Sequence, residues 1–180
     1  MTILEIPDQS FRTADEATIR TFLADRGILF ERWEAKAELG PDATQDDVLA
    51  AYDHALGPYM KAHGYQTADV IRVLPQMEGL DAIRGKFLDE HTHSEDEVRF
   101  FVEGKGAFWF NLEGGQDPFC VVCEAGDFIS VPAGTKHWFD MGASPRVTAI
   151  RVFSNMEGWV PHYTQSGVSQ RYNKPYEAAL

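Results

Sequence analysis

The sequence is poor in cysteine and has no long hydrophobic run, and both deficits narrow the class of protein. Cys120 and Cys123 are the two cysteines among 180 residues, too few for the disulfide framework of a small secreted domain. No run approaches the ~18 apolar residues that a membrane-spanning helix needs. The opening Met-Thr-Ile-Leu-Glu-Ile-Pro-Asp lacks the basic and then apolar regions of a secretory signal. We therefore expect a cytoplasmic protein.

Positive charge is also scarce in this sequence. Lysine and arginine number 16 against 28 aspartates and glutamates, which gives a formal net charge of -12. Such a balance argues against nucleic acid or an anionic membrane surface as a partner. Internal repeats of fixed period and low-complexity segments are absent as well. We expect a single domain over residues 1–180, large enough to bury a core, and a monomer.

The first part of the chain, residues 1–79, is expected to be mainly helical. Thr13 and Glu16 have the spacing of a capping box, in which the threonine hydroxyl accepts from a first-turn N–H and the glutamate reaches back. Gly57-Pro58 is expected to break a second helix into two. The predicted elements are a strand at 2–6, a helix at about 14–25, a strand from Ile28 to Trp33, a helix from Thr44 to the Gly57-Pro58 break, a short helix ending at His63 and a strand from Val70 to Leu74.

From about Leu80 the pattern changes to short apolar or alternating runs separated by Gly, Pro, Asp and Asn. Many short strands at such spacing are typical of an all-β sandwich or barrel. We therefore expect a β core over 80–155, on which the N-terminal helices pack. An irregular tail over 156–180 should follow, with its last residues disordered. The candidate strands are 80–88, 98–102, 107–112, 119–123, 127–131, 136–140 and 146–153.

Three good ligands for a first-row transition metal lie within seven residues in this β region. His91 and His93 share one face of a strand, because side chains alternate along it. Glu97 follows a short polar break, where the chain can turn it back toward the imidazoles. Two neutral imidazoles and a carboxylate suit Fe(II), Ni, Mn or Zn far better than Ca or Mg. A purely structural histidine pair beside an acidic cluster is the weaker alternative.

A second stretch offers a fourth ligand. Val131-Pro132-Ala-Gly134 is a strand end followed by a tight-turn signal, and this turn can aim His137 inward. The remaining histidines, His54, His63 and His162, stand alone in helical or irregular stretches. For each of them we expect a surface or structural role, since histidine is commonly intermediate in burial and needs one partner.

Together the two stretches resemble the two motifs of the cupin superfamily. The first motif, Gly-x5-His-x-His-x3-Glu-x6-Gly, is matched from Gly85 to Gly104. The second, Gly-x5-Pro-x-Gly-x2-His-x3-Asn, is matched from Gly126 to His137, and Met141 replaces its final Asn. That position is not a ligand in the superfamily, so the ligand set stays complete. The resemblance implies a mostly β fold, an antiparallel sandwich or barrel of jelly-roll type.

A closer resemblance covers residues 80–155. The chain is similar there to the acireductone dioxygenase family of methionine salvage, in the strings His-Thr-His-Ser-Glu-Asp-Glu-Val-Arg-Phe-Phe-Val-Glu-Gly, Cys-Glu-Ala-Gly-Asp-Phe-Ile-Ser-Val-Pro-Ala-Gly-Thr-Lys-His-Trp-Phe-Asp-Met-Gly and Arg-Val-Thr-Ala-Ile-Arg-Val-Phe. The resemblance implies one metal ion per chain, Fe(II) or Ni(II), held by His91, His93, Glu97 and His137 with two positions left open. It implies that the substrates are an acireductone and O2.

The resemblance also implies two outcomes of the reaction. With Fe(II), the expected products are formate and the keto acid precursor of methionine. With Ni(II), they are formate, carbon monoxide and a methylthio carboxylic acid. The ligand set itself does not choose between these metals, because availability in the cell often decides which ion is bound.

Residues beside the ligands take roles from the same resemblance. Arg99 shares strand parity with Glu97 and would stabilise the substrate dianion, although the pattern alone leaves a surface arginine equally open. Arg151 lies in an apolar strand, where an unpaired charge is costly, so it either pairs with an acid or faces the cavity. Asp96 would orient a ligand or take a substrate proton, and Glu90 would assist metal incorporation.

The cysteines and most aromatic residues are expected to be structural. Cys120 and Cys123 should point to opposite faces of a strand as buried thiols. The aromatic residues assigned mostly to the core are Phe100, Phe101, Phe108, Trp109, Trp138 and Phe139. Two rival functions stay open: a different cupin oxygenase or isomerase, acting on a thiol, flavonol or sugar, and a non-enzymatic cupin that binds a small ligand. The Glu-Val-Arg-Phe-Phe string argues against the first rival, and the complete ligand set argues against the second.

Overall fold

A computed structural model describes residues 1–35, 39–40, 42–155 and 160–176 of the chain. Its strands are β1 (Ile3–Ile6), β2 (Phe11–Thr13), β3 (Leu29–Arg32), β4 (Thr67–Val73), β5 (His91–Thr92), β6 (Glu97–Phe110), β7 (Phe119–Glu124), β8 (Asp127–Val131), β9 (His137–Asp140), β10 (Val147–Phe153) and β11 (His162–Tyr163). Its helices are the 3-10 turn η1 (Pro7–Gln9) and the α-helices α1 (Glu16–Ala24), α2 (Gln45–His63), α3 (Leu80–Leu88) and α4 (Ser169–Tyr176).

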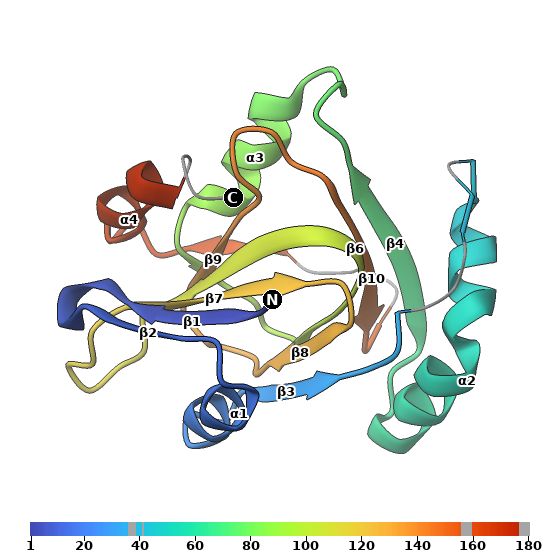
Figure 1. The fold of residues 1–180 in the computed structure, drawn as a ribbon, viewed down its shortest axis with the longest axis horizontal. Helices are drawn as coiled ribbons and strands as arrows, with labels where there is room; N and C mark the ends of the chain where they lie inside the picture. The colour runs from blue at the N-terminus through green and yellow to red at the C-terminus, as the bar shows by residue number, and fades with distance from the viewer. Residues whose placement is uncertain (36–38, 41, 156–159, 177–180) are drawn as a thin grey trace.

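Strand β6 belongs to two curved sheets at once and joins them (Figure 1). Its first half pairs with β8 and β10, and its second half pairs with β7 and β9, all antiparallel. One sheet runs β11-β5-β9-β6-β7-β1-β2, and the other runs β4-β10-β6-β8-β3. The expected antiparallel β fold with helices packed on it is confirmed. The runs 98–102 and 107–112, expected as separate strands, are parts of β6.

The helices lie on the outside of these sheets (Figure 1). Helix α1 lies beside β3, α2 lies beside β4, and α4 lies on the side away from α2. The strand Leu29–Arg32 and the strand Thr67–Val73 agree with the predictions for this part of the chain. No helix in the described part of the chain is long and apolar enough to span a membrane.

The start of α1 differs from the expectation. Asp15 is the N-cap, and its Oδ1 accepts from the backbone N–H of Thr18 at 2.8 Å. Thr13, expected to cap the helix, instead ends β2, and its hydroxyl accepts from the N–H of Asp15 at 3.1 Å. Aspartate is also a somewhat better N-cap than threonine in isolation. Pairing of β2 with β1 keeps Thr13 extended and moves the helix start two residues on.

Helix α2 is continuous, so the predicted break at Gly57-Pro58 is wrong. Proline in a helix removes one hydrogen bond, and its ring also clashes with the Cβ of the residue before it. Gly57 has no Cβ, which removes that second cost. Val48, Tyr52 and Leu56 are buried on one face of the helix, against a cluster on β6, β8 and β10. Burial of this face stabilises the helix by more than the proline costs.

Residues 80–88 form helix α3, although a strand was expected there. Leu80, Ile83 and Phe87 stand at the i, i+3, i+7 spacing of one helical face, and all three pack against the core between the sheets. The strand prediction is wrong because an apolar run this short fits both a strand and a helix, and burial of this face selects the helix. Helix α3 brings Phe87 to within 5.6 Å of the Arg99 guanidinium, measured to the ring centroid.

The C-terminal part is more regular than expected. Strand β11 pairs with β5, and helix α4 packs Tyr172 against Trp109, with ring centroids 5.1 Å apart. The irregular tail predicted over 156–180 is therefore wrong for its described part. The aromatic residues of this part follow no single period in the sequence, because they pack on two different elements. Residues 177–180, expected to be disordered, lie outside the described residues.

Three groups of buried side chains hold the elements together. One lies between the sheets and under α3, one under α2, and one next to α4. The six aromatic residues expected in the core are all at most 2% exposed. Cys123 belongs to the first group and Cys120 to the third, on opposite faces of β7, and they form no disulfide. Burial raises the pKa of the Cys123 thiol well above its ordinary value, so it is unreactive.

The turn of β6 from one sheet into the other leads to a stability prediction. Gly104 lies at this turn with φ +78, and a Cβ there would lie 1.6 Å from the carbonyl oxygen of Arg146. We expect Gly104→Ala to lower the free energy of unfolding by about 3 kcal/mol or more. Gly115→Ala is the matched control: it shares the positive φ (+75) but meets nothing within 4 Å, so it should cost about 1 kcal/mol. Urea denaturation of both variants measures the difference, and equal losses would contradict the steric argument.

Candidate metal centre

The two histidines of the first motif lie in or next to β5, the second strand of one sheet. His91 starts β5, which has β9 on one side and β11 on the other, and it pairs directly with His137 of β9. His93 follows β5 where the chain begins its polar turn. Pairing between β5 and β9 thus brings a ligand of each sequence motif side by side.

The turn after His93 and the turn before His137 are tied to each other by hydrogen bonds from backbone N–H groups. The N–H of Gly134 donates to the carbonyl oxygen of His93 at 2.8 Å, and the N–H of Ala133 donates to Asp96 Oδ1 at 2.9 Å. Gly134 has φ +76, a left-handed conformation that glycine adopts without strain. Glu97 then begins β6, opposite Val131 of β8. Turn geometry thus aims the carboxylate at the imidazoles, as the sequence predicts.

His91, His93, Glu97 and His137 converge in one buried cluster. Their potential ligand atoms all lie within 4.8 Å of one another, and each residue is at most 7% exposed. Oε2 of Glu97 lies 3.0 Å from Nε2 of His93 and 2.9 Å from Nε2 of His137. All four residues singled out from the sequence are therefore brought together.

Backbone carbonyls determine which nitrogen of each imidazole faces the cluster. Nδ1 of His91 lies 2.7 Å from the carbonyl oxygen of Asp89, and Nδ1 of His137 lies 2.8 Å from that of Thr135. Nδ1 of His93 lies 3.1 Å from the carbonyl oxygen of Val160. A carbonyl only accepts, so each Nδ1 carries the hydrogen, and in a neutral imidazole Nε2 then offers a lone pair. Partners of this kind fix ligand histidines in metal sites.

Burial and a neighbouring charge favour the protonation states of His91 and Glu97 that can bind a metal ion. Burial lowers the pKa of His91 to about 4, so this imidazole is neutral near pH 7. Burial alone would raise the pKa of Glu97, but the positive charge of Arg99, the largest opposing contribution, holds it well below its ordinary value. The site thus presents a carboxylate beside imidazole lone pairs. At such distances these groups repel one another unless a cation lies between them, so the donor set fits a divalent transition metal.

Arg99 is buried beside the cluster, at 2% exposure, which excludes the surface arginine that the pattern left open. Its Nε lies 2.7 Å from Oε1 of Glu97, so the carboxylate has one oxygen toward Arg99 and the other toward the imidazoles. The guanidinium also lies 4.5 Å from the ring centroid of Phe139 and 5.1 Å from that of Phe108. Arg99 is therefore held within an apolar shell, next to the cluster.

Arg151 pairs with an acid, which is one of the two alternatives left open for it. Its Nε and Nη2 lie 2.8 Å and 2.5 Å from the two carboxylate oxygens of Asp69 on β4. Arg151 also lies directly opposite Arg99 in the β10–β6 register, so their side chains share one sheet face. Its charge contributes to the lowered pKa of Arg99, after burial and against the opposing effect of Glu97.

Asp96 immediately precedes β6, and its carboxylate does not belong to the cluster of four ligand atoms. It accepts from the N–H of Ala133 and, at 3.2 Å, from the hydroxyl of Tyr65. This geometry suits a residue that joins the turn after His93 to the turn before His137. No local pattern marks Tyr65 as a partner of Asp96, because the two residues lie 31 positions apart.

Glu90 precedes His91 and is 3% exposed. Burial alone would raise its pKa, but hydrogen bonds from Thr164, Asn111 and Ser166 outweigh burial and lower it, so the carboxylate is charged. It does not belong to the cluster of four ligand atoms. The single histidines are elsewhere: His54 and His63 are exposed on α2, and His162 is exposed on β11, as expected.

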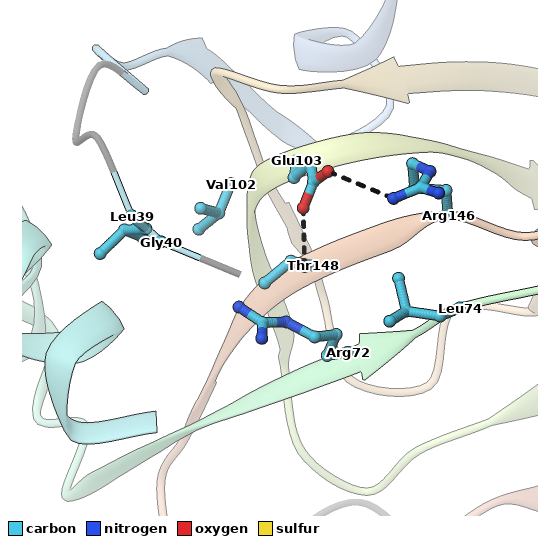
Figure 2. Close-up of a pocket in the computed structure, with 8 residues that line it drawn as sticks. All are labelled: Leu39, Gly40, Arg72, Leu74, Val102, Glu103, Arg146 and Thr148. Atoms are coloured by element: carbon cyan, nitrogen blue, oxygen red, sulfur yellow. Dashed lines mark hydrogen bonds and ion pairs between the residues drawn. The ribbon is translucent and has the colours of Figure 1, made fainter. Parts of the chain in front are cut away.

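A separate cavity of about 400 Å³ lies on the outer face of β4, β10 and β6 (Figure 2). Arg72, Thr148 and Glu103 stand in one row across these strands. Figure 2 shows Arg146 and Thr148 directed at the Glu103 carboxylate, 3.9 Å and 3.5 Å from its oxygens. None of the described residues that line this cavity is a histidine or a cysteine, so they do not form a second site for a transition metal.

Comparisons with known proteins agree with this geometry. A family model described as the ARD/ARD' family matches residues 8–161. An acireductone dioxygenase of Picosynechococcus sp. is 57% identical over 172 residues, covering 96% of this chain and 97% of that protein. One of Cronobacter sakazakii is 49% identical over 162 residues, covering 90% and 89%.

A solved structure is similar over nearly the whole chain. It is an acireductone dioxygenase from Bacillus anthracis with a cadmium ion in its active center. The TM-score is 0.81 at 34% identity, with 91% of this chain and 98% of that chain covered. A protein of the same fold thus binds a metal ion in its active center.

The cluster predicts the metal content of the protein. We expect about one divalent transition ion per chain after exposure to Ni(II) and dialysis, and less than about a tenth of that in His91→Ala, because three donors hold the ion less tightly than four. His54→Ala, which removes an exposed histidine of α2, should keep the full content. Elemental analysis by plasma mass spectrometry measures all three proteins. Full loading of His91→Ala would exclude His91 as a ligand.

Proposed function

This chain belongs to the ARD/ARD' family, and on that premise we propose that it cleaves an acireductone with O2 at the cluster of His91, His93, Glu97 and His137. The observation that carries the proposal is the convergence of these three imidazoles and one carboxylate in a buried cluster. Both motifs that supply the cluster lie within the span matched by the family model. Family membership also argues against the rival cupin functions that the sequence left open.

The four cluster residues would hold one Fe(II) or Ni(II) ion. A six-coordinate ion with four protein ligands keeps two positions for a chelating substrate. When bound, the ion would supply Lewis acidity and a place where the two oxygens of the substrate are held together. The chain itself supplies imidazoles whose Nε2 atoms are turned inward by the carbonyls of Asp89, Thr135 and Val160. We propose that the pathway is methionine salvage, as the resemblance to the family implies.

Charge balance supports a substrate dianion. Glu97 and Arg99 cancel each other as a buried ion pair, so a divalent ion would leave the site with a net charge of about +2. An acireductone is an ene-diol beside a ketone, and its doubly deprotonated form carries the opposite charge. Arg99 is already fixed by Glu97 and by the rings around it, so its position costs little reorganisation when a charge arrives.

The other candidate residues support the site in different ways. We propose that Arg151, held by Asp69, adds a second positive charge on the sheet face that carries Arg99. We propose that Asp96 positions the ligands by joining the 132–134 turn to the start of β6. Phe87, Phe108 and Phe139 surround Arg99 and would exclude water from the substrate. The cytoplasmic location and the monomeric state stay predictions.

Product analysis tests the function and the metal together. The apoprotein is reconstituted separately with Fe(II) and with Ni(II), then given a synthetic acireductone and O2. We expect formate from both forms. The keto acid should accompany it with Fe(II), and carbon monoxide with a methylthio carboxylic acid should accompany it with Ni(II). Oxygen uptake that is the same with and without added metal would refute the proposal.

Arg99→Met tests whether the positive charge of Arg99 stabilises the bound substrate. Methionine keeps the length and apolar contacts of the side chain but removes the charge. We expect kcat/KM for the acireductone to fall by about 100-fold or more, with Arg99→Lys intermediate because it keeps a charge without the planar fork. The matched control is Arg146→Met, at an arginine that is 62% exposed, which should retain activity. Metal content is measured alongside, and full activity in a metal-loaded Arg99→Met protein would show that Arg99 does not act on the substrate.

A further inference from the structure

Glu90 is directed at the C-terminal segment of the chain by its hydrogen bonds. Its Oε1 accepts from the hydroxyl of Thr164 at 2.5 Å and from that of Ser166 at 2.8 Å. Its Oε2 accepts from Nδ2 of Asn111 at 2.6 Å, and its backbone carbonyl accepts from the N–H of Thr164 at 3.0 Å. Both carboxylate oxygens are therefore used to connect residues that are far apart in the sequence.

The segment that Glu90 holds, residues 160–166, is here termed the strap. Within it, β11 pairs with β5, so that His162 lies opposite Thr92 and Tyr163 lies opposite the ligand His91. The strap is thus the outer neighbour of the short strand that begins with a metal ligand. The hydroxyl of Tyr163 also donates to the carbonyl oxygen of Lys86 at 3.1 Å.

The strap also makes direct contact with a second ligand. The carbonyl oxygen of Val160 is the partner of Nδ1 of His93, 3.1 Å away. The corresponding carbonyls for His91 and His137 come from residues two positions before each ligand. His93 alone among the three imidazoles of the cluster takes its partner from a remote segment, so its orientation depends on where the strap lies.

Backbone strain in the strap indicates that surrounding contacts hold it in place. Gln165 lies between the two residues whose hydroxyls reach Glu90, and its φ is +58. A left-handed conformation is unfavourable for a non-glycine residue, and it persists where surrounding contacts hold it. Here it directs the hydroxyls of Thr164 and Ser166 to the same oxygen.

From this geometry we propose that Glu90 is a positioning residue for the metal centre. It anchors the strap, and the anchored strap places the Val160 carbonyl so that His93 presents Nε2 to the metal. Glu90 acts as an acceptor of hydrogen bonds in this role, and its negative charge is not needed. The inference rests on the metal site proposed above, and it differs from delivery of the ion by the Glu90 carboxylate, which requires the charge.

Three variants separate the hydrogen-bonding role from the charge. Glu90→Ala removes the anchor, and Thr164→Val with Ser166→Ala removes the strap's side-chain donors while leaving Glu90 in place. Both should weaken Ni(II) binding by about 10-fold or more, the range for residues that orient a ligand histidine. Glu90→Gln keeps an acceptor oxygen for both hydroxyls, and rotation of the Asn111 amide can satisfy its NH2 group. It should therefore bind within about threefold of the unmodified chain.

Affinity is measured by titrating each apoprotein with Ni(II) alone against a competing chelator. Glu16→Gln, at a glutamate that is 56% exposed on α1, is the matched control and should bind like the unmodified chain. The proposal is overturned if Glu90→Gln binds as poorly as Glu90→Ala while the strap double variant binds normally, because the charge would then matter and the strap would not. It is also overturned if none of the variants weakens binding. Failure of the unmodified chain to bind Ni(II) would instead refute the metal site itself.

Hydrogen exchange in the metal-free protein gives a readout that is independent of loading. The N–H of Thr164 donates to the Glu90 carbonyl, so its exchange reports on the strap. We expect it to speed up in Glu90→Ala and in the strap double variant, and to stay slow in Glu90→Gln. Unchanged exchange in the double variant would contradict the anchoring. If Glu90→Ala does not fold, the double variant and Glu90→Gln carry the test.

Discussion

The geometry of the site depends on three hydrogen bonds from imidazole Nδ1 groups to backbone carbonyls. A carbonyl cannot donate, so each of these bonds places the hydrogen on Nδ1 and directs Nε2 at a common centre. Without them an imidazole could turn over and present an N–H, which repels a cation. Backbone acceptors are well suited to this task, because they move only when the chain moves. The orientation of each imidazole therefore depends on the turns that hold the carbonyls.

The fold holds these carbonyls in place by joining turns that are distant in sequence. Pairing of β5 with β9 sets His91 beside His137, and the hydrogen bond from Gly134 to the carbonyl of His93 ties the next turn to them. Strand β6 starts with Glu97 at this position and continues into both sheets. A shift in any of these elements would move a residue of the cluster. The strand pairings that stabilise the β core therefore also position the cluster residues.

Most of the ligand set could be predicted from the sequence because it is encoded locally. His91, His93 and Glu97 lie within one turn and its flanks, and alternation along a strand already places the imidazoles together. The strands after residue 97 follow from their short apolar or alternating runs between turn residues. The contact between His93 and Val160 spans 67 positions, and no local pattern marks a carbonyl as the partner of a distant imidazole. Helix α3 was missed for a different reason, because nine residues allow both a helical and a strand reading.

The buried pair of Glu97 and Arg99 is better explained by function than by stability. Taking two charges out of water costs several kcal/mol per ion, and a well-packed apolar pair of similar volume is often as stable or more so. Glu97 nevertheless has one oxygen toward Arg99 and the other toward the imidazoles. The pair is neutral as a unit, so the core tolerates it. In the proposed function the pair would give the metal a fixed carboxylate and would leave a guanidinium in an apolar shell, where an incoming anion is attracted more strongly than it would be in water.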